Sequence, residues 1–296
     1  MDDKNHNHTP NHTARAIIWS IAGATLLAVL KLTTGVLTNS MAILASALDS
    51  GMDAASSTIN YIAAREAVKP PDEDHEYGHG KIESLASLFQ SLAIGVSGLF
   101  LIAESIRRLV RGSFVQEIGS GIAVMGFSLF VTLFIIARLT FAQKKTGSLI
   151  LSTEKLHYTS DIFTNGGALL ALILVKYTRI IALDLIFSAA VAGYIFKTSY
   201  GILRQAIDEL LDKSLPPVAK EEISQMIHDY HPSLGGLHNF RSRRVGSQIF
   251  MDFHIEIRGE DDFKKAHNMT EGLIVKIRER YPDADVTVHY DPEGEI

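Results

Sequence analysis

The chain has 296 residues, 12 of them histidine and none of them cysteine, with a formal net charge of −5. Its composition is 47% hydrophobic, near that of an ordinary globular protein, which argues against a disordered, collagenous or low-complexity chain. The absence of cysteine excludes disulfide scaffolds, thiolate metal sites and cysteine nucleophiles. The mild acidity argues against a nucleic-acid partner.

Charged residues are unevenly distributed along the chain. They make up about 16% of residues 1–211 and about 32% of residues 212–296. This split predicts a membrane domain followed by a soluble domain. We expect a polar tail over residues 1–13, a transmembrane domain over 14–209 and a cytosolic domain over 210–296.

Six stretches are long and apolar enough to cross a bilayer, which takes about 20 residues of helix. They are residues 14–37, 41–64, 83–107, 117–142, 153–176 and 180–204. An even number of spans puts both termini on one side of the membrane. Lys and Arg are modestly enriched at the span ends on that side, which favours the cytosol and leaves the opposite orientation open.

Two of these stretches carry pairs of ionisable side chains, although each such residue costs about 2.5–3.5 kcal/mol at the centre of a bilayer. The second contains Asp49 and Asp53, and the fifth contains His157 and Asp161. A spacing of four residues places both members of a pair on one helix face. Two such faces would offer four ligands, the usual number for a tetrahedral divalent metal ion.

An alternative interpretation is that these groups lie at water-filled helix ends or pair with Lys31 or Lys197. One lysine could not neutralise three buried carboxylates, whereas a metal ion could. Oxygen ligands with one imidazole suit Zn(II), Fe(II), Co(II) or Mn(II) and disfavour Cu(I) and Ca(II).

The loop after the second stretch opens with Pro70 and Pro71, which end the helix. Asp72, His75 and His79 follow within a few residues and form a second compact set of candidate metal ligands. A solvated acidic loop without a metal remains the alternative.

The sequence of the soluble part predicts helices and strands in the order αββαβ. This is a small α+β sandwich resembling a ferredoxin-like or metallochaperone-like domain. The expected elements are a helix over 218–231, strands over 237–245 and 248–258, a helix over 263–281 and a strand over 285–290. Strand alternation puts His254 and His289 on polar faces, where they could join His238 and Asp291. Scattered surface histidines remain the alternative.

Taken together, these residues resemble the cation diffusion facilitator family, in particular its bacterial zinc and iron(II) exporters. The matching motifs are Asp49-x-x-x-Asp53, His157-x-x-x-Asp161, the loop from His75 to Lys81, the Leu210–Asp212 stretch and the terminal His289–Pro292. The resemblance implies an antiporter of divalent metal ions and protons in the bacterial inner membrane. It also implies a homodimer, with a V-shaped membrane part, that works by alternating access. The first, second, fourth and fifth membrane helices would rock against the third and sixth.

The resemblance further implies three kinds of metal site and one ion pair at the dimer contact. The transport site would comprise Asp49, Asp53, His157 and Asp161; the loop site Asp72, His75 and His79; and a binuclear cytosolic site His238, His254, His267, His289 and Asp291. The ion pair would join Lys81 to Asp212. Zinc is the expected substrate and regulatory ligand, with Fe(II), Cd(II), Co(II) and Mn(II) left open.

Two other functions use the same side chains. A membrane-bound metal sensor would bind metal without transport, but the chain carries no recognisable output motif. An intramembrane metalloenzyme would need an open ligand position and a base, and no His-Glu-x-x-His sequence occurs. We therefore expect a transporter that is not an enzyme.

Overall fold

The computed structural model describes residues 9–38, 41–111, 122–178, 182–246, 248–258 and 262–292, and the chain divides into two compact units, Met1–Ile207 and Asp208–Ile296. Several predictions fall partly outside the described residues. These are most of the polar tail, the starts of the fourth and sixth expected spans and the last four residues of the cytosolic domain.

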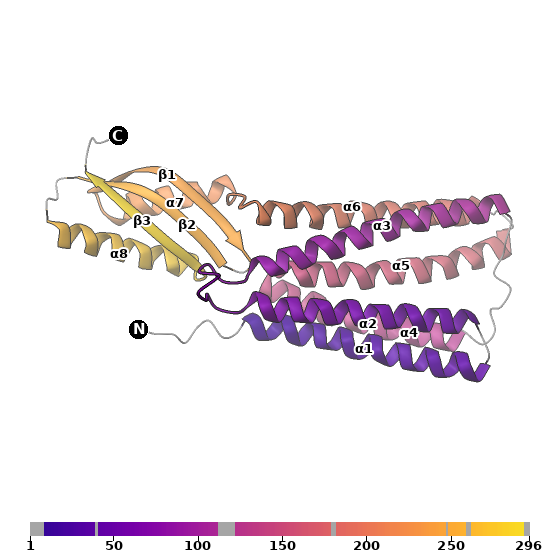
Figure 1. Cartoon of the computed structure of the whole chain (residues 1–296). Coiled ribbons are helices and arrows are strands. Elements are labelled where there is room, and N and C mark those ends of the chain that lie inside the picture. The colour runs from indigo at the N-terminus through magenta and orange to yellow at the C-terminus, as the bar shows by residue number, and fades with distance from the viewer. Residues whose placement is uncertain are drawn as a thin grey trace. The chain divides into compact units, whose positions relative to one another are not determined.

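The first unit consists of six long helices (Figure 1). They are α1 (Thr9–Thr38), α2 (Met41–Ala67), α3 (Lys81–Arg111), α4 (Ile122–Thr146), α5 (Leu149–Thr178) and α6 (Ala182–Leu210). Helices of 25 to 31 residues are long enough to cross the hydrocarbon core of a bilayer. Within the described part of the chain, three contain a stretch that is also apolar enough: His12–Thr38, Lys81–Phe100 and Gly126–Thr146.

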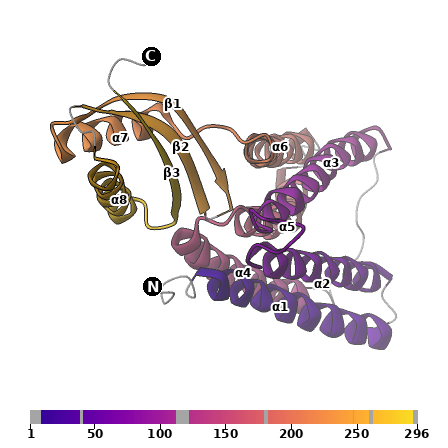
Figure 2. The same cartoon turned by 60° about the vertical axis from the view of Figure 1, so that its left-hand side comes forward.

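The six helices pack in two groups that share α5. Figures 1 and 2 show α3 beside α6, and α1, α2 and α4 together on the other side of α5. One apolar cluster joins α1, α2, α4 and α5, and a second joins α3, α5 and α6. A Cβ atom at Gly23 would lie 2.6 Å from Ile135, so glycine permits the close approach of α1 to α4.

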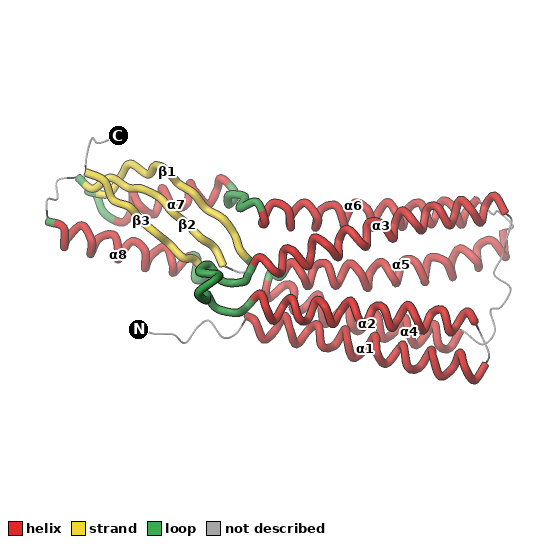
Figure 3. The backbone as a smooth tube through the Cα atoms, in the orientation of Figure 1, coloured by secondary structure: helices red, strands yellow, loops and turns green. Residues whose placement is uncertain are grey.

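The second unit is a three-stranded sheet with two helices (Figure 3). Its elements are α7 (Pro217–Tyr230), β1 (Leu234–Val245), β2 (Gln248–Ile257), α8 (Phe263–Arg280) and β3 (Ala284–Pro292). The strand order is β1-β2-β3, with β2 antiparallel to β1 and parallel to β3. The predicted fold class, six membrane helices followed by an αββαβ domain, is confirmed.

Both helices of this unit cover one face of the sheet. Along β2, Met251, Phe253 and Ile255 are fully buried against side chains of α7 and α8 such as Ile223 and Leu273. Because successive strand residues point to opposite faces, the intervening residues of β2 lie on the face without helices. This uncovered face carries the histidines considered below.

Candidate metal sites

A first group of candidate ligands lies between α2 and α5 in the membrane unit. Asp53, His157 and Asp161 each offer a ligand atom, and the three atoms lie within 4.8 Å of one another. The Nε2 atom of His157 is 3.0 Å from the Oδ1 atom of Asp53 and 3.9 Å from the Oδ2 atom of Asp161. The helix face that carries His157 and Asp161 is therefore turned towards Asp53.

We call Asp53, His157 and Asp161 the membrane cluster. Two further ionisable residues, Asp49 and Lys31, lie near it. Asp49 is exposed and lies one turn before Asp53 on α2, outside the group of close ligand atoms. The Nζ atom of Lys31 on α1 donates a hydrogen bond of 2.8 Å to the Oγ atom of Ser50. An ammonium group thus lies beside the residue that follows Asp49.

A second group lies in the loop between α2 and α3. The Oδ1 atom of Asp72 accepts hydrogen bonds from the backbone N–H groups of His75 and Asp74, at 2.7 and 3.1 Å. The His75 backbone bond is the main cause that lowers the pKa of Asp72 below its ordinary value. The other oxygen of Asp72 is 3.3 Å from the Nε2 atom of His79, whose ring centroid lies 4.5 Å from that of His75.

The backbone of this loop explains why its three predicted ligands meet. Gly78 has a φ of +76°, which L side chains rarely adopt, and its N–H donates to the carbonyl oxygen of His75. The resulting turn brings His79 back to Asp72. Asp72 and His75 are exposed, whereas the Nδ1 atom of His79 is buried and has no hydrogen-bond partner among the described residues.

A third group lies on the uncovered face of the sheet, where the register aligns three histidines in one row. His238 on β1 is paired with His254 on β2, and His254 is paired with His289 on β3. The ring centroids of His238 and His254 are 5.1 Å apart, and those of His254 and His289 are 4.6 Å apart. The shifts in register on both sides of His238 accompany this alignment.

Asp291 binds all three histidines of this row. Its Oδ2 atom is 3.1 Å from the Nε2 atom of His238 and 3.0 Å from the Nδ1 atom of His254, and its Oδ1 atom is 3.0 Å from the Nε2 atom of His289. The hydrogen bond with His254 is the main cause that lowers the pKa of Asp291. An ionised carboxylate surrounded by imidazoles is a suitable ligand set for a divalent transition metal.

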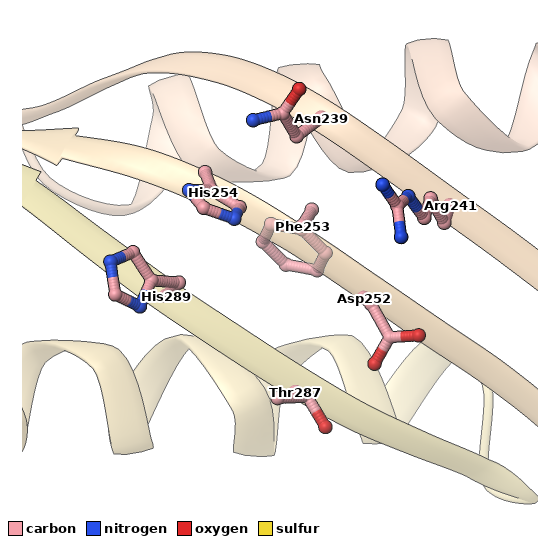
Figure 4. A pocket seen from close by; sticks show the side chains of 7 residues that line it. All are labelled: Asn239, Arg241, Asp252, Phe253, His254, Thr287 and His289. Atoms are coloured by element: carbon pink, nitrogen blue, oxygen red, sulfur yellow. The ribbon is translucent and has the colours of Figure 1, made fainter.

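A hollow of about 220 Å³ opens beside this row (Figure 4). Its lining comprises Asn239, Arg241, Asp252, Phe253, His254, Thr287 and His289. Two members of the row, His254 and His289, line this hollow and can therefore be reached by an incoming ion.

Three other predicted residues are not joined to these groups by the described contacts. His267 on α8 is exposed, and its ring stacks at 6.4 Å on that of Phe263. Lys81 and Asp212 belong to different units, so their ion pair stays a prediction. Asp212 accepts a hydrogen bond of 3.3 Å from Arg243 within its own unit.

Sequence reasoning missed one buried residue next to the membrane cluster. Glu154 is fully buried and lies three residues before His157 on α5. The spacing alone was a usable signal, because residues three apart share a helix face. In the sequence, however, Glu154 looks like one of several polar residues at the start of a span.

Long apolar helices that hold one group of candidate metal ligands, followed by a compact domain that holds another, are typical of a membrane protein that handles metal cations. The family model "Cation efflux transmembrane domain" matches residues 17–211, and "Cation efflux protein, cytoplasmic domain" matches residues 215–293. The chain belongs to the cation diffusion facilitator family. It is therefore an integral membrane protein and a cation efflux transporter.

Full-length relatives agree with this assignment. The chain is 35% identical over 273 residues to the "Cation-efflux pump FieF" of Shewanella oneidensis, covering 92% of each chain. It is 31% identical over 275 residues to "Protein p34" of Rickettsia prowazekii, covering 93% of this chain and 91% of the relative. The "Metal-bound C-terminal domain of CzcD transporter from Thermotoga maritima" is 30% identical, covers 27% of this chain and 92% of that chain, and has a TM-score of 0.25.

Proposed function

We propose that the protein exports Zn(II) from the cytosol in exchange for protons, by alternating access in a homodimer. The observation that carries this proposal is the membrane cluster, in which two carboxylates and one imidazole meet between α2 and α5. Ionisable groups are costly in a bilayer, and in many membrane proteins they mark ion sites and transport pathways. Asp49, one turn from Asp53, would complete the set as the fourth ligand.

Proton coupling follows from the chemistry of the ligands. A metal ion binds the neutral imidazole of His157 and the ionised carboxylates of Asp53 and Asp161, so protons compete with it for the same atoms. On the side of higher acidity the protons displace the ion, and on the cytosolic side the ion displaces the protons. His157 would be the main proton carrier of this exchange.

The ligand set supports zinc as the substrate. Nitrogen and oxygen ligands in a small cluster suit Zn(II), and Fe(II), Co(II), Mn(II) and Cd(II) are the competing ions to compare with it. The proposed location is the bacterial inner membrane with both termini in the cytosol. The family includes the iron and zinc exporters that the sequence motifs resemble.

The cytosolic cluster is proposed to regulate or stabilise the dimer. Metal bound by His238, His254, His289 and Asp291 would favour one arrangement of the two soluble domains, with His267 as a further ligand of a binuclear site. The loop cluster of Asp72, His75 and His79 would bind an additional ion. The predicted ion pair of Lys81 and Asp212 would hold the subunits together near the membrane surface.

Flux into reconstituted vesicles tests the proposal. Purified protein is expected to accumulate Zn(II) when the vesicle interior is acidic and to stop when the pH gradient is abolished. Asp53→Asn is expected to remove this flux, whereas Asp229→Asn, an exposed change on α7, is expected to retain it. Comparison of the five metals with wild type and His157→Asp tests whether the imidazole sets the preference. Metal binding without any flux would contradict the proposal and favour a sensor.

A further inference from the structure

A layer of buried polar side chains crosses the membrane unit next to the membrane cluster. It consists of Ser57 and Asn60 on α2, Gln90 on α3, and Glu154 and Tyr158 on α5, and we call it the polar layer. Glu154 and Ser57 have no exposed surface, and the other three are less than a tenth exposed. Buried polar groups are costly unless they are hydrogen-bonded, so these residues call for a physical reason.

The carboxyl group of Glu154 is the centre of the polar layer. Its Oε1 atom accepts a hydrogen bond from the hydroxyl of Ser57, and its Oε2 atom accepts from the side-chain amides of Asn60 and of Gln90, the latter at 3.3 Å. The Nδ2 atom of Asn60 also donates to the Oε1 atom of Gln90 at 2.8 Å. One side chain of α5 is therefore fixed to two other helices by neutral donors.

The polar layer continues to α1 through Tyr158. The Tyr158 hydroxyl lies 3.0 Å from the Ser57 hydroxyl and donates to the backbone carbonyl of Ser20 at 3.3 Å. Tyr158 directly follows His157, and their ring centroids are 5.3 Å apart. The backbone that carries the imidazole is thus held from its neighbouring residue.

The polar layer and the membrane cluster join the same two helices at successive turns. Ser57 follows Asp53 by four residues on α2, and Glu154 precedes His157 by three residues on α5. Each pair of neighbours therefore shares a helix face. The Ser57–Glu154 contact and the Asp53–His157 contact are consecutive connections between α2 and α5.

We propose that Glu154 is a positioning residue for metal transport. It fixes α2 against α5 one turn from the membrane cluster and so sets the separation of Asp53 from His157. In some proteins a buried, hydrogen-bonded polar group fixes the register of the helices that it joins, and the contacts of Glu154 suit that role. This inference rests on the proposed function, because it assigns the metal ligands to that cluster.

Equilibrium binding of zinc and cadmium to the full chain tests the inference independently of flux. The protein carries Asp72→Asn with His79→Ala, and His238→Ala with His254→Ala, which remove two ligands from each of the other two clusters, so that the measurement reports the membrane cluster. Glu154→Ala is expected to weaken zinc binding by about 10–100-fold, the usual effect of losing a group that orients a metal ligand. Cadmium binding is expected to weaken less, because a loosened site accommodates the larger ion. Glu154→Gln, which keeps the shape and one acceptor oxygen, is expected to restore part of the zinc preference.

Gln143→Ala is the matched control. Gln143 on α4 bonds Ser152 and Lys155 on α5, so its loss breaks a polar contact between helices without touching α2. Unchanged zinc affinity and zinc-to-cadmium ratio in Glu154→Ala would overturn the inference, and where that variant does not fold, the same result in Glu154→Gln would overturn it. Altered binding in a protein that shows no flux would uphold the positioning role and contradict only the proposed function.

Discussion

Acidification is expected to release metal from the cytosolic cluster. The slope of the metal association constant against pH is expected to reveal how many imidazoles bind the ion. The pKa of Asp291 is lowered, chiefly by the hydrogen bond with His254, so this carboxylate stays ionised well below neutral pH. Protons therefore compete for the imidazoles and not for Asp291. His238 and His254 are the two imidazoles whose ligand atoms lie within 4.8 Å of that of Asp291 and of each other.

The magnitude follows from this count. An imidazole binds metal only in its neutral form, so each protonated imidazole ligand must lose one proton before it binds the ion. The association constant then falls about tenfold per pH unit for each imidazole, or about 100-fold for two. His254→Ala is expected to reduce the fall to about tenfold per unit. His289 bonds the other oxygen of Asp291 and is assigned to the second ion of the binuclear site, so His289→Ala is expected to leave the fall near 100-fold for the first ion.

Competition between the protein and a fluorescent zinc indicator measures this slope at substoichiometric zinc as the solution is acidified. The protein carries Asp53→Asn with His157→Ala, and Asp72→Asn with His79→Ala, which remove two ligands from each of the membrane and loop clusters, so that the slope reports the cytosolic cluster. His228→Ala, an exposed histidine of α7, is the control and is expected to keep the wild-type slope. The assignment of His238 and His254 as ligands would be refuted by an association constant that does not change with pH in the protein with both histidines. It would also be refuted by an unchanged slope in His254→Ala.

Four further predictions address other parts of the molecule. Asp53→Asn removes a carboxylate that is 3.0 Å from its imidazole partner, and a loss of about 3 kcal/mol, roughly 100-fold in zinc affinity, is expected in a binding titration. Asp72→Asn removes the charged acceptor of two backbone N–H groups, so hydrogen exchange of the loop amides is expected to accelerate. The hydrogen bond from the Tyr281 hydroxyl lowers the pKa of Glu222 below its ordinary 4.5. The ionised Glu222 therefore stabilises the folded second unit above pH 4.5, and this contribution is lost as the pH falls through the lowered pKa. Exchange of α7 amides is therefore expected to be faster in Glu222→Gln at pH 7, with the difference vanishing in acid. Ile255→Ala opens a cavity in the sheet core and is expected to destabilise the second unit by about 2–5 kcal/mol, measured by urea-dependent exchange.

The elements of the fold could be predicted from sequence because each depends on a local pattern. Apolar length located the six helices, and alternation along β2 separated Met251 and Phe253 from His254. Alternation assigns a face but not a register. Only strand pairing places His238 opposite His254, since register shifts interrupt β1 on both sides of His238.

The polar layer could not be predicted in the same way. Glu154 has its three donors on α2 and α3, between 64 and 97 residues away along the chain. No local spacing reports such contacts, whereas the pair of His157 and Asp161 is visible as a repeat of four residues. The sequence therefore indicated the candidate ligands of the membrane cluster but not the hydrogen-bonded residues beside them.

The residues of the polar layer come from both groups of helices that would move against each other in alternating access. Ser57, Asn60 and Glu154 belong to helices of one proposed moving group, whereas Gln90 belongs to α3 of the other. The contact of Gln90 with Glu154 measures 3.3 Å, and Gln90 has a second, shorter contact of 2.8 Å with Asn60. Motion between the groups must lengthen or exchange the contacts of Gln90, while those between Ser57 and Glu154 can persist. The carboxyl group would then keep Asp53 beside His157 in every state of the cycle, because it needs only its partners on α2 to do so.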